Sequence, residues 1–282
     1  MRKILIPTDF SVNAMNAINY AVSLFKYDVS EFFIMHAYQD MAYAYETSSS
    51  NKTVQNVAEV AKKAAKKKLE NTLEKIQTIS PNPRHTYNMI LANNTLLDEA
   101  HKIVEKENID IIVMGTKGET NNKKLTFGSH TLQVLKYVDC PVLAVPENYR
   151  YTQPKKILFP TDYMIPYKRR ELKLVCEMLS SFRSKIDVLY LSKTQTLSKR
   201  QEDNQNFLKE ELCKNKLNFN VENSHDIVGS IYRYVKENKI DMLVMVNSKH
   251  TFSDNILFQS TIDELGLHLD IPFLALQNIE RN

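Results

Sequence analysis

The sequence is poor in glycine, cysteine and long apolar runs, and each scarcity excludes a class of protein. Its 282 residues contain five glycines, where average usage of about 7% would give roughly twenty. No apolar run reaches the roughly eighteen residues that a membrane span needs, so we expect no membrane partner. The three cysteines, Cys140, Cys176 and Cys213, are scattered and in no metal-like spacing. This pattern predicts free thiols in a reducing cytoplasm.

The net charge and the N-terminal residues also favour a location in the cytoplasm. The formal net charge of +4 is too small to indicate binding to nucleic acid. The dense basic run Lys62–Glu70 carries alanines at helical spacing, which is typical of a solvated helix face. The N-terminal "MRKILIPTDF" has an apolar run far shorter than the core of a signal peptide. We therefore expect a cytoplasmic protein.

Two segments of the chain occur twice, in the same order. "RKILIPTDF" at Arg2–Phe10 returns as "KKILFPTDY" at Lys155–Tyr163, 153 residues later. "IDIIVMG" at Ile109–Gly115 returns as "IDMLVMV" at Ile240–Val246, 131 residues later. Repetition with preserved order indicates two copies of one structural unit.

Each copy alternates apolar runs with amphipathic segments, which predicts an α/β fold with a parallel sheet and right-handed crossovers. We place the boundary in the polar segment 146–154, which has a proline at each end. The predicted domains are 1–148 and 149–282. The extra residues of the first copy fall mainly in 39–53, which either covers a ligand or forms a plain surface loop.

Three of the five glycines, Gly115, Gly118 and Gly128, lie in "MGTKGETNNKKLTFGSH" at the end of the predicted fourth strand. In a doubly wound sheet, ligands bind beyond the carboxyl ends of the strands where the strand order reverses, so Asp9 and Gly115 would flank one crevice. Glycine lets a phosphate approach the backbone closely and also supplies positive φ. A helix starting after Gly128 adds unpaired N–H groups. The segment predicts a phosphate cradle, the alternative being glycines that only form turns.

These motifs resemble the universal stress protein family, specifically its ATP-binding branch. The resemblance is carried by "PTDFS" after the first strand, "VMGTKG" after the fourth and "FGSHTLQVL" before the last. The family pattern Gly-x2-Gly-x9-Gly-Ser/Thr is matched at every fixed position. As a tandem pair, the resemblance covers the whole chain. It implies two tandem doubly wound domains, each a five-stranded parallel sheet of order 3-2-1-4-5 with helices on both faces.

The resemblance also implies a ligand, ATP with or without Mg²⁺, and a set of nucleotide-binding residues. The backbone near Ala37 and the Asp9 side chain would hold adenine and ribose, and the later positions would hold phosphates. The full set is Pro7, Thr8, Asp9, Ala37, Met114, Gly115, Lys117, Gly118, Gly128, Ser129, His130 and Thr131. No catalytic residue and no metal ligand is predicted.

Several of these residues also have a structural interpretation. Asp9 could cap the following helix through backbone N–H groups. Ser129 and Thr131 can add hydroxyl donors to a phosphate site, whereas His130 is needed there only for its backbone. We interpret His36, on a buried strand, as a core histidine bonded to a neighbour.

The second copy lacks the cradle. With the same offset, its counterparts of the three glycines are Val246, Lys249 and Gln259, although Ser260 and Asp162 are kept. A valine side chain would occupy phosphate space and would be strained at positive φ. We interpret this domain as structural, or as binding something other than a triphosphate.

Three functions follow from these patterns. The first is a cytoplasmic stress-response regulatory protein that binds ATP or a related adenine nucleotide in its N-terminal domain, with at most slow hydrolysis or self-phosphorylation. The alternative is a ligand-independent module for protein interaction or dimerisation. An enzyme resembling ATP pyrophosphatases would need a glycine-rich loop where this chain has "PTDFSVNA".

The last strands of the two copies, "CPVLAVP" and "IPFLALQ", would be edge strands in the order that the resemblance implies. Exposed apolar edges favour pairing. We expect the two edges to pair within the chain as an intramolecular pseudo-dimer. A homodimer of the whole chain is a further expectation.

Overall fold

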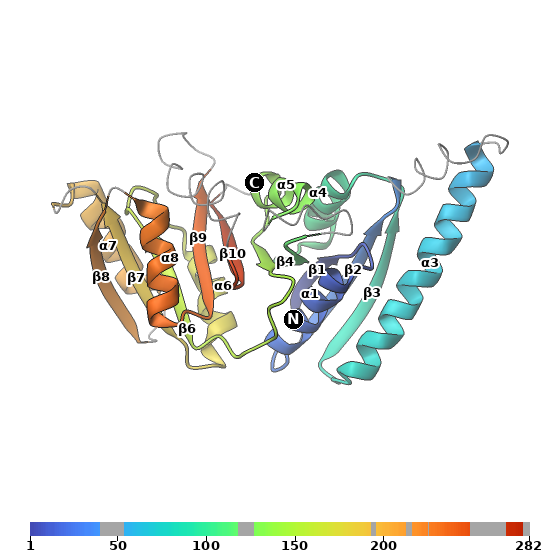
Figure 1. Ribbon diagram of the computed structural model, residues 1–282, viewed down its shortest axis with the longest axis horizontal. Coiled ribbons are helices and arrows are strands. Elements are labelled where there is room, and N and C mark those ends of the chain that lie inside the picture. Colours follow the sequence, from blue (N-terminus) through green and yellow to red (C-terminus); the bar gives the residue numbers. More distant parts are fainter. Residues whose placement is uncertain are drawn as a thin grey trace.

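The strands of the computed structural model join into one ten-stranded sheet (Figure 1). The strand order is β3-β2-β1-β4-β5-β10-β9-β6-β7-β8. The structure describes residues 1–39, 54–117, 127–192, 196–212, 216–224, 226–248 and 269–278.

The first half of the sheet has the strand order 3-2-1-4-5. Its helices begin where the sequence supplies caps: Ser11 accepts a hydrogen bond from the backbone N–H of Ala14, and Thr95 accepts one from Asp98. The elements are β1 (Arg2–Pro7), α1 (Val12–Leu24), β2 (Ser30–Ala37), α3 (Val54–Ile79), β3 (His85–Ala92), α4 (Leu96–Glu107), β4 (Ile111–Gly115), α5 (Ser129–Tyr137) and β5 (Val142–Val145).

The second half repeats this order, which confirms two tandem doubly wound α/β units. Its β6 lies between β7 and β9, as β1 lies between β2 and β4. The segment between β9 and β10, where the first half has α5, lies largely outside the described residues. The elements are β6 (Lys156–Thr161), α6 (Arg169–Ser180), β7 (Lys185–Ser192), α7 (Lys199–Glu211), β8 (Leu217–Asn223), α8 (Ile227–Asn238), β9 (Met242–Ser248) and β10 (Phe273–Asn278).

Buried side chains cover both faces of the sheet. Along β1, Ile4 and Ile6 belong to one apolar cluster with residues of α1 and α3, whereas Leu5 belongs to a second cluster with residues of α4 and α5. Alternation of this kind places successive residues on opposite faces. Both clusters contain residues of both halves, so the core is continuous across the sheet.

The two halves meet where β5 and β10 pair antiparallel, with Leu274 opposite Leu143. The expected edge strands therefore lie side by side. A buried polar network supports the junction: the Asn247 Nδ2 donates to Gln277 Oε1 at 2.9 Å, and the Gln277 Nε2 donates to the Leu135 carbonyl of α5 at 2.9 Å. These bonds tie α5 of the first half to the strands of the second.

The structure corrects the expectation about the cysteines at one position. Cys140 is a buried free thiol, but Cys176 is disulfide-bonded, so the expectation of free thiols is wrong at that position. Cysteines scattered in sequence can be neighbours in a fold, and spacing alone cannot exclude a bond. None of the helices in the described part of the chain is long and apolar enough to cross a membrane.

Candidate functional site

A tight turn follows β1 at the carboxyl edge of the first half. The Phe10 N–H donates to Thr8 Oγ1 at 3.1 Å, and the Ser11 N–H donates to Asp9 Oδ1 at 3.0 Å. Phe10 has a φ of 68°, a left-handed conformation that costs a non-glycine residue free energy and needs support from its surroundings. The Asp9 carboxylate thus holds the entry into α1.

The second half builds the same turn. The Tyr163 N–H donates to Thr161 Oγ1 at 2.8 Å, the Met164 N–H donates to Asp162 Oδ1 at 2.9 Å, and Tyr163 has a φ of 56°. The turn is therefore built in both copies, including the one that lacks the glycines. The expectation that Asp9 caps α1 is wrong, because Ser11 is the N-cap residue of that helix. Asp9 instead has a structural role in the turn through the Ser11 N–H, and any contact of Asp9 with a ligand would be additional.

His36 lies at the end of β2, against the turn. Its Nδ1 donates to the Thr8 carbonyl at 2.7 Å, and its ring centroid lies 4.3 Å from that of Phe10. Burial lowers the pKa of His36, which favours the neutral ring. The sequence-based interpretation as a core histidine bonded to a neighbour is confirmed.

Gly115 ends β4 and faces the side chain of Asn13 in the first turn of α1. A Cβ at position 115 would lie 2.9 Å from Asn13 Cγ. The Asn13 Nδ2 donates to the Lys117 carbonyl at 2.6 Å. Close approach of a side chain therefore requires glycine here.

None of the glycines that the structure describes has a positive φ. The expectation of positive φ is wrong at Gly115, which continues the extended strand β4. Likewise, Val246 lies within β9, so the strain expected for a valine there does not arise. Positions 115 and 246 therefore differ in the size of the side chain and not in backbone strain.

Helix α5 begins at this edge without a side-chain cap. Gly128 is its N-cap residue and makes no side-chain bond, while its backbone N–H donates to the Thr116 carbonyl at 2.7 Å. Ser129 and His130 are exposed. A helix N-terminus of this kind presents backbone donors and the positive end of the helix dipole. Thr131 differs from expectation because its hydroxyl donates to the Gly115 carbonyl at 2.9 Å, which leaves only its backbone for a ligand.

The remaining predicted positions supply main-chain groups at the same edge. Pro7 ends β1, Ala37 ends β2 and Met114, buried in the core, precedes Gly115. Lys117 lies two residues after the end of β4 and is half-buried. Gly118 lies outside the described residues.

Three buried polar atoms at this edge have no hydrogen-bond partner in the part of the chain that the structure describes. They are Asn13 Oδ1, His36 Nε2 and Thr116 Oγ1, in residues that are 3%, 8% and 1% exposed. Buried polar atoms are nearly always hydrogen-bonded, so each needs an explanation such as a bound ligand or water. The sequence analysis missed Asn13 and Thr116, although Asn13 lies only two residues after the capping Ser11.

In the second half, large side chains lie at the corresponding edge. Tyr167 is buried before the start of α6, and its hydroxyl bonds to Thr161 Oγ1. Tyr163 and Tyr190 stack with centroids 5.0 Å apart. Buried aromatic side chains therefore pack against the repeated turn in the second half.

No three His, Cys, Asp or Glu side chains among the described residues lie close enough to hold a metal ion. The edge of the first half thus combines an uncapped helix N-terminus, a glycine without steric bulk and unpartnered polar atoms. This chemistry fits a polar ligand with an anionic group. It offers no metal centre in that part of the chain.

Comparison with known proteins agrees with this architecture. The model of the universal stress protein family matches residues 1–146, and the chain belongs to that family. Universal stress protein MJ0577 of Methanocaldococcus jannaschii is 28% identical over 152 residues, which are 51% of this chain and 94% of the relative.

A solved structure shows the same fold across both halves. A universal stress protein from Archaeoglobus fulgidus aligns with a TM-score of 0.72 at 15% identity, over 98% of each chain. A universal stress protein solved in complex with cAMP covers 52% of this chain and is itself covered to 98%, at 14% identity and a TM-score of 0.37.

Proposed function

We propose that the chain is a cytoplasmic stress-response regulatory protein that binds ATP, or a related adenine nucleotide, in its N-terminal unit, residues 1–148. One observation carries the proposal: the uncapped start of α5 meets Gly115 and three unpartnered buried polar atoms at one sheet edge. The unit of residues 149–282 is proposed to be structural, since Tyr167 and Val246 occupy the corresponding edge.

The phosphates would lie at the start of α5, where the backbone of Gly128 to Thr131 and the helix dipole favour negative charge. Lys117 would add positive charge from the end of β4. The base and ribose would lie toward Ala37 and Asp9, as in the ATP-binding branch that the motifs resemble. Mg²⁺ would accompany ATP through its phosphates.

Regulation, rather than turnover, is the proposed output. The described residues at this edge include no acidic cluster that would hold catalytic Mg²⁺, and the Asp9 carboxylate is used by the turn. Phosphoryl transfer depends on such a metal and on a positioned base. Nucleotide occupancy would instead change the conformation that a partner recognises, with hydrolysis or self-phosphorylation slow at most.

Changing Gly128 to aspartate tests the site without damaging the fold. At φ −70° and ψ 163°, Gly128 has a backbone conformation that aspartate readily adopts at an N-cap. Its carboxylate would cap α5 and fill the anion site, so we expect ATP affinity to fall at least tenfold while stability stays equal or rises by about 1 kcal/mol. Calorimetric titration of nucleotide-stripped protein measures the affinity, and thermal unfolding measures the stability.

The matched control is Gly128→Ala, which adds no competing carboxylate and should keep most of the affinity. We expect one ATP site per chain for the unmodified protein. Two sites would contradict the assignment of the second unit. Absence of ATP binding would favour the ligand-independent interaction module.

The repeated turn offers a second, internally matched experiment. Asp9→Ala and Asp162→Ala each remove one bond to a backbone N–H, so each should cost about 1 kcal/mol of stability. Only Asp9→Ala should also weaken ATP binding, by about tenfold, because the unit that contains Asp162 is proposed to be structural. Equal effects of both changes on binding would argue that Asp9 acts through the turn alone.

A further inference from the structure

Helices α1 and α6 follow the first strand of their respective halves, but their surroundings differ. The linker 146–155 covers α1: the Asn16 Nδ2 donates to the carbonyls of Pro146 and Tyr149 at 3.1 Å each. The Tyr149 and Tyr151 rings pack edge-on to Tyr20, with centroids 6.0 and 5.3 Å away. Apolar linker side chains therefore fill the space beside α1.

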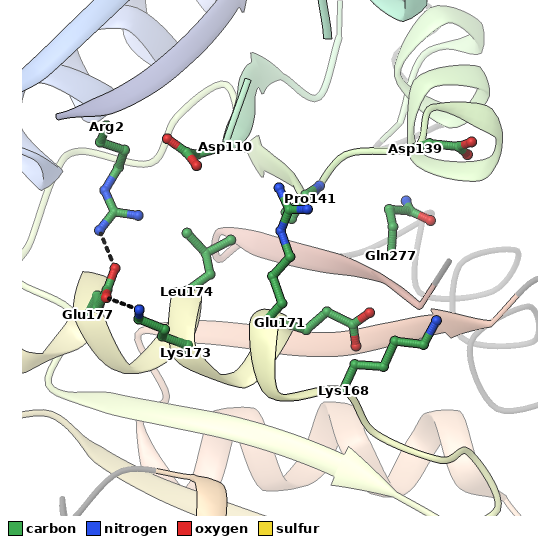
Figure 2. A pocket seen from close by; sticks show the side chains of 11 residues that line it. Arg2, Asp110, Asp139, Pro141, Lys168, Glu171, Lys173, Leu174, Glu177 and Gln277 are labelled. Carbon is green, nitrogen blue, oxygen red and sulfur yellow. Dashed lines mark hydrogen bonds and ion pairs between the residues drawn. The ribbon is translucent and has the colours of Figure 1, made fainter. Parts of the chain in front are cut away.

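The matching space beside α6 is a cavity of about 260 Å³. We call it the α6 cleft, and define it by the residues that line it: Arg2, Asp110, Asp139 and Pro141 of the first half, and Lys168, Arg170, Glu171, Lys173, Leu174, Glu177 and Gln277 of the second. Figure 2 shows Lys168 and Glu171 at one end, and ion pairs from Glu177 to Arg2 and Lys173 at the other.

The cations of the cleft differ in their ion pairs within the described part of the chain. Arg2 and Lys173 lie 3.5 and 3.6 Å from the Glu177 carboxylate. By contrast, Lys168 and Arg170 make no ion pair within 4.0 Å with any residue in the described ranges. Both lie at the start of α6, where the N-cap residue Lys168 makes no side-chain cap bond and the Lys168 backbone N–H donates to the Glu171 carboxyl. The helix dipole adds positive potential there.

Glu171 supplies the independent indication of a ligand. Its side chain lines the cleft, the residue is 6% exposed, and its Oε2 has no hydrogen-bond partner in the described structure. Burial raises the pKa of this carboxyl to about 8, against the opposing effect of Lys168 and Arg170. At pH 7 it is therefore a neutral O–H donor rather than a competing anion.

We propose that the α6 cleft is a second binding site, for a small organic anion that carries a carboxylate or phosphate group. Lys168 and Arg170 supply the charge, and the Glu171 hydroxyl donates a hydrogen bond. The volume suits a molecule smaller than a nucleotide, because sites for larger ligands occupy about 300–1,000 Å³. The site lies between the halves, so its occupancy would stiffen the junction.

The test uses the full chain saturated with ATP, which keeps probes out of the proposed nucleotide site. Malonate and glycerol 3-phosphate are titrated separately at constant ionic strength, with binding followed by amide chemical shifts. We expect saturable binding with a dissociation constant of about 0.1–1 mM and shifts at residues of α6. The double variant Lys168→Ala/Arg170→Ala should bind at least tenfold more weakly.

Arg169→Ala is the matched control, since Arg169 is on the same turn but pairs with Glu211 at 2.8 Å, outside the cleft. It should change the affinity less than twofold. If Arg169→Ala lost as much affinity as the double variant, the binding would depend on general surface charge, and the proposal would be overturned. Competition of the probes with ATP, or absence of binding by both probes, would also overturn it.

A pH series adds a readout for Glu171. Other charged groups that line the cleft are Arg2 from β1, Asp110 before β4, Asp139 before β5, and Lys168, Arg170, Lys173 and Glu177 around α6. Binding by the unmodified chain should weaken at least threefold from pH 7 to pH 9, as Glu171 becomes negative. Glu171→Gln keeps a neutral donor and should lose this dependence, whereas an unchanged pH profile in the variant would contradict the role of Glu171.

Discussion

Changing Glu171 to glutamine is expected to stabilise the fold by about 2–4 kcal/mol at pH 8 and hardly at all at pH 5. The pKa of Glu171 is about 8 in the folded chain, against an ordinary value of 4.5, because the carboxyl is buried. Between these values the folded state keeps a proton that the unfolded state has lost, so stability falls as pH rises. Each unit of pKa corresponds to about 1.4 kcal/mol, and glutamine avoids the loss.

The measurement is urea denaturation at several pH values from 5 to 8.5. Glu177→Gln is the control, because this carboxyl lies on the same helix but its side chain is 51% exposed. We expect the curve of Glu171→Gln to diverge upward from that of the unmodified chain as pH rises. Parallel curves across this window would show that Glu171 ionises normally in the folded state.

Changing Gly115 to valine, the residue found at its counterpart Val246, is expected to destabilise the N-terminal unit by about 2–3 kcal/mol. The reason is overpacking, since even a Cβ would lie 2.9 Å from Asn13. Asn13 is held in place by its bond to the Lys117 carbonyl, so it cannot move without breaking that bond. Thermal and urea unfolding of the purified variant measure the cost.

A double-mutant cycle identifies the cause. Asn13→Ala alone should cost about 1 kcal/mol through the lost hydrogen bond. Combined with Gly115→Val it should cost clearly less than the sum of the two, with a coupling of at least about 1 kcal/mol. Strict additivity would show that something other than Asn13 requires glycine at this position.

The fold could be predicted from the sequence because its signals are local and repeated. Ser11 and Thr95 are strong helix caps, and the strands are apolar runs. The repeat of "ILIPTDF" as "ILFPTDY" indicates that the two halves share one fold. The pairing of β5 with β10 followed from their expected place at the sheet edges. The caps and the apolar runs each depend on residues that are only a few positions apart, and such local patterns can be read directly from a sequence.

The site was less predictable because it depends on contacts between distant residues. Asn13 and Gly115 are a hundred positions apart, and their contact depends on how α1 lies on the sheet. The Thr131 hydroxyl bonds to the end of β4 for the same reason. Glu171 reads as an ordinary charged helix residue in sequence, and only the fold shows that it is buried.

The ten-stranded sheet also constrains how chains can associate. In a single-domain relative, a last strand left at the edge of the sheet is open to a second molecule. Here β5 and β10 pair with each other, so neither strand has a free edge at which another copy of the chain could pair. In the sheet that the structure describes, only β3 and β8 end the strand order, and any association through added strands would have to form at those distant margins.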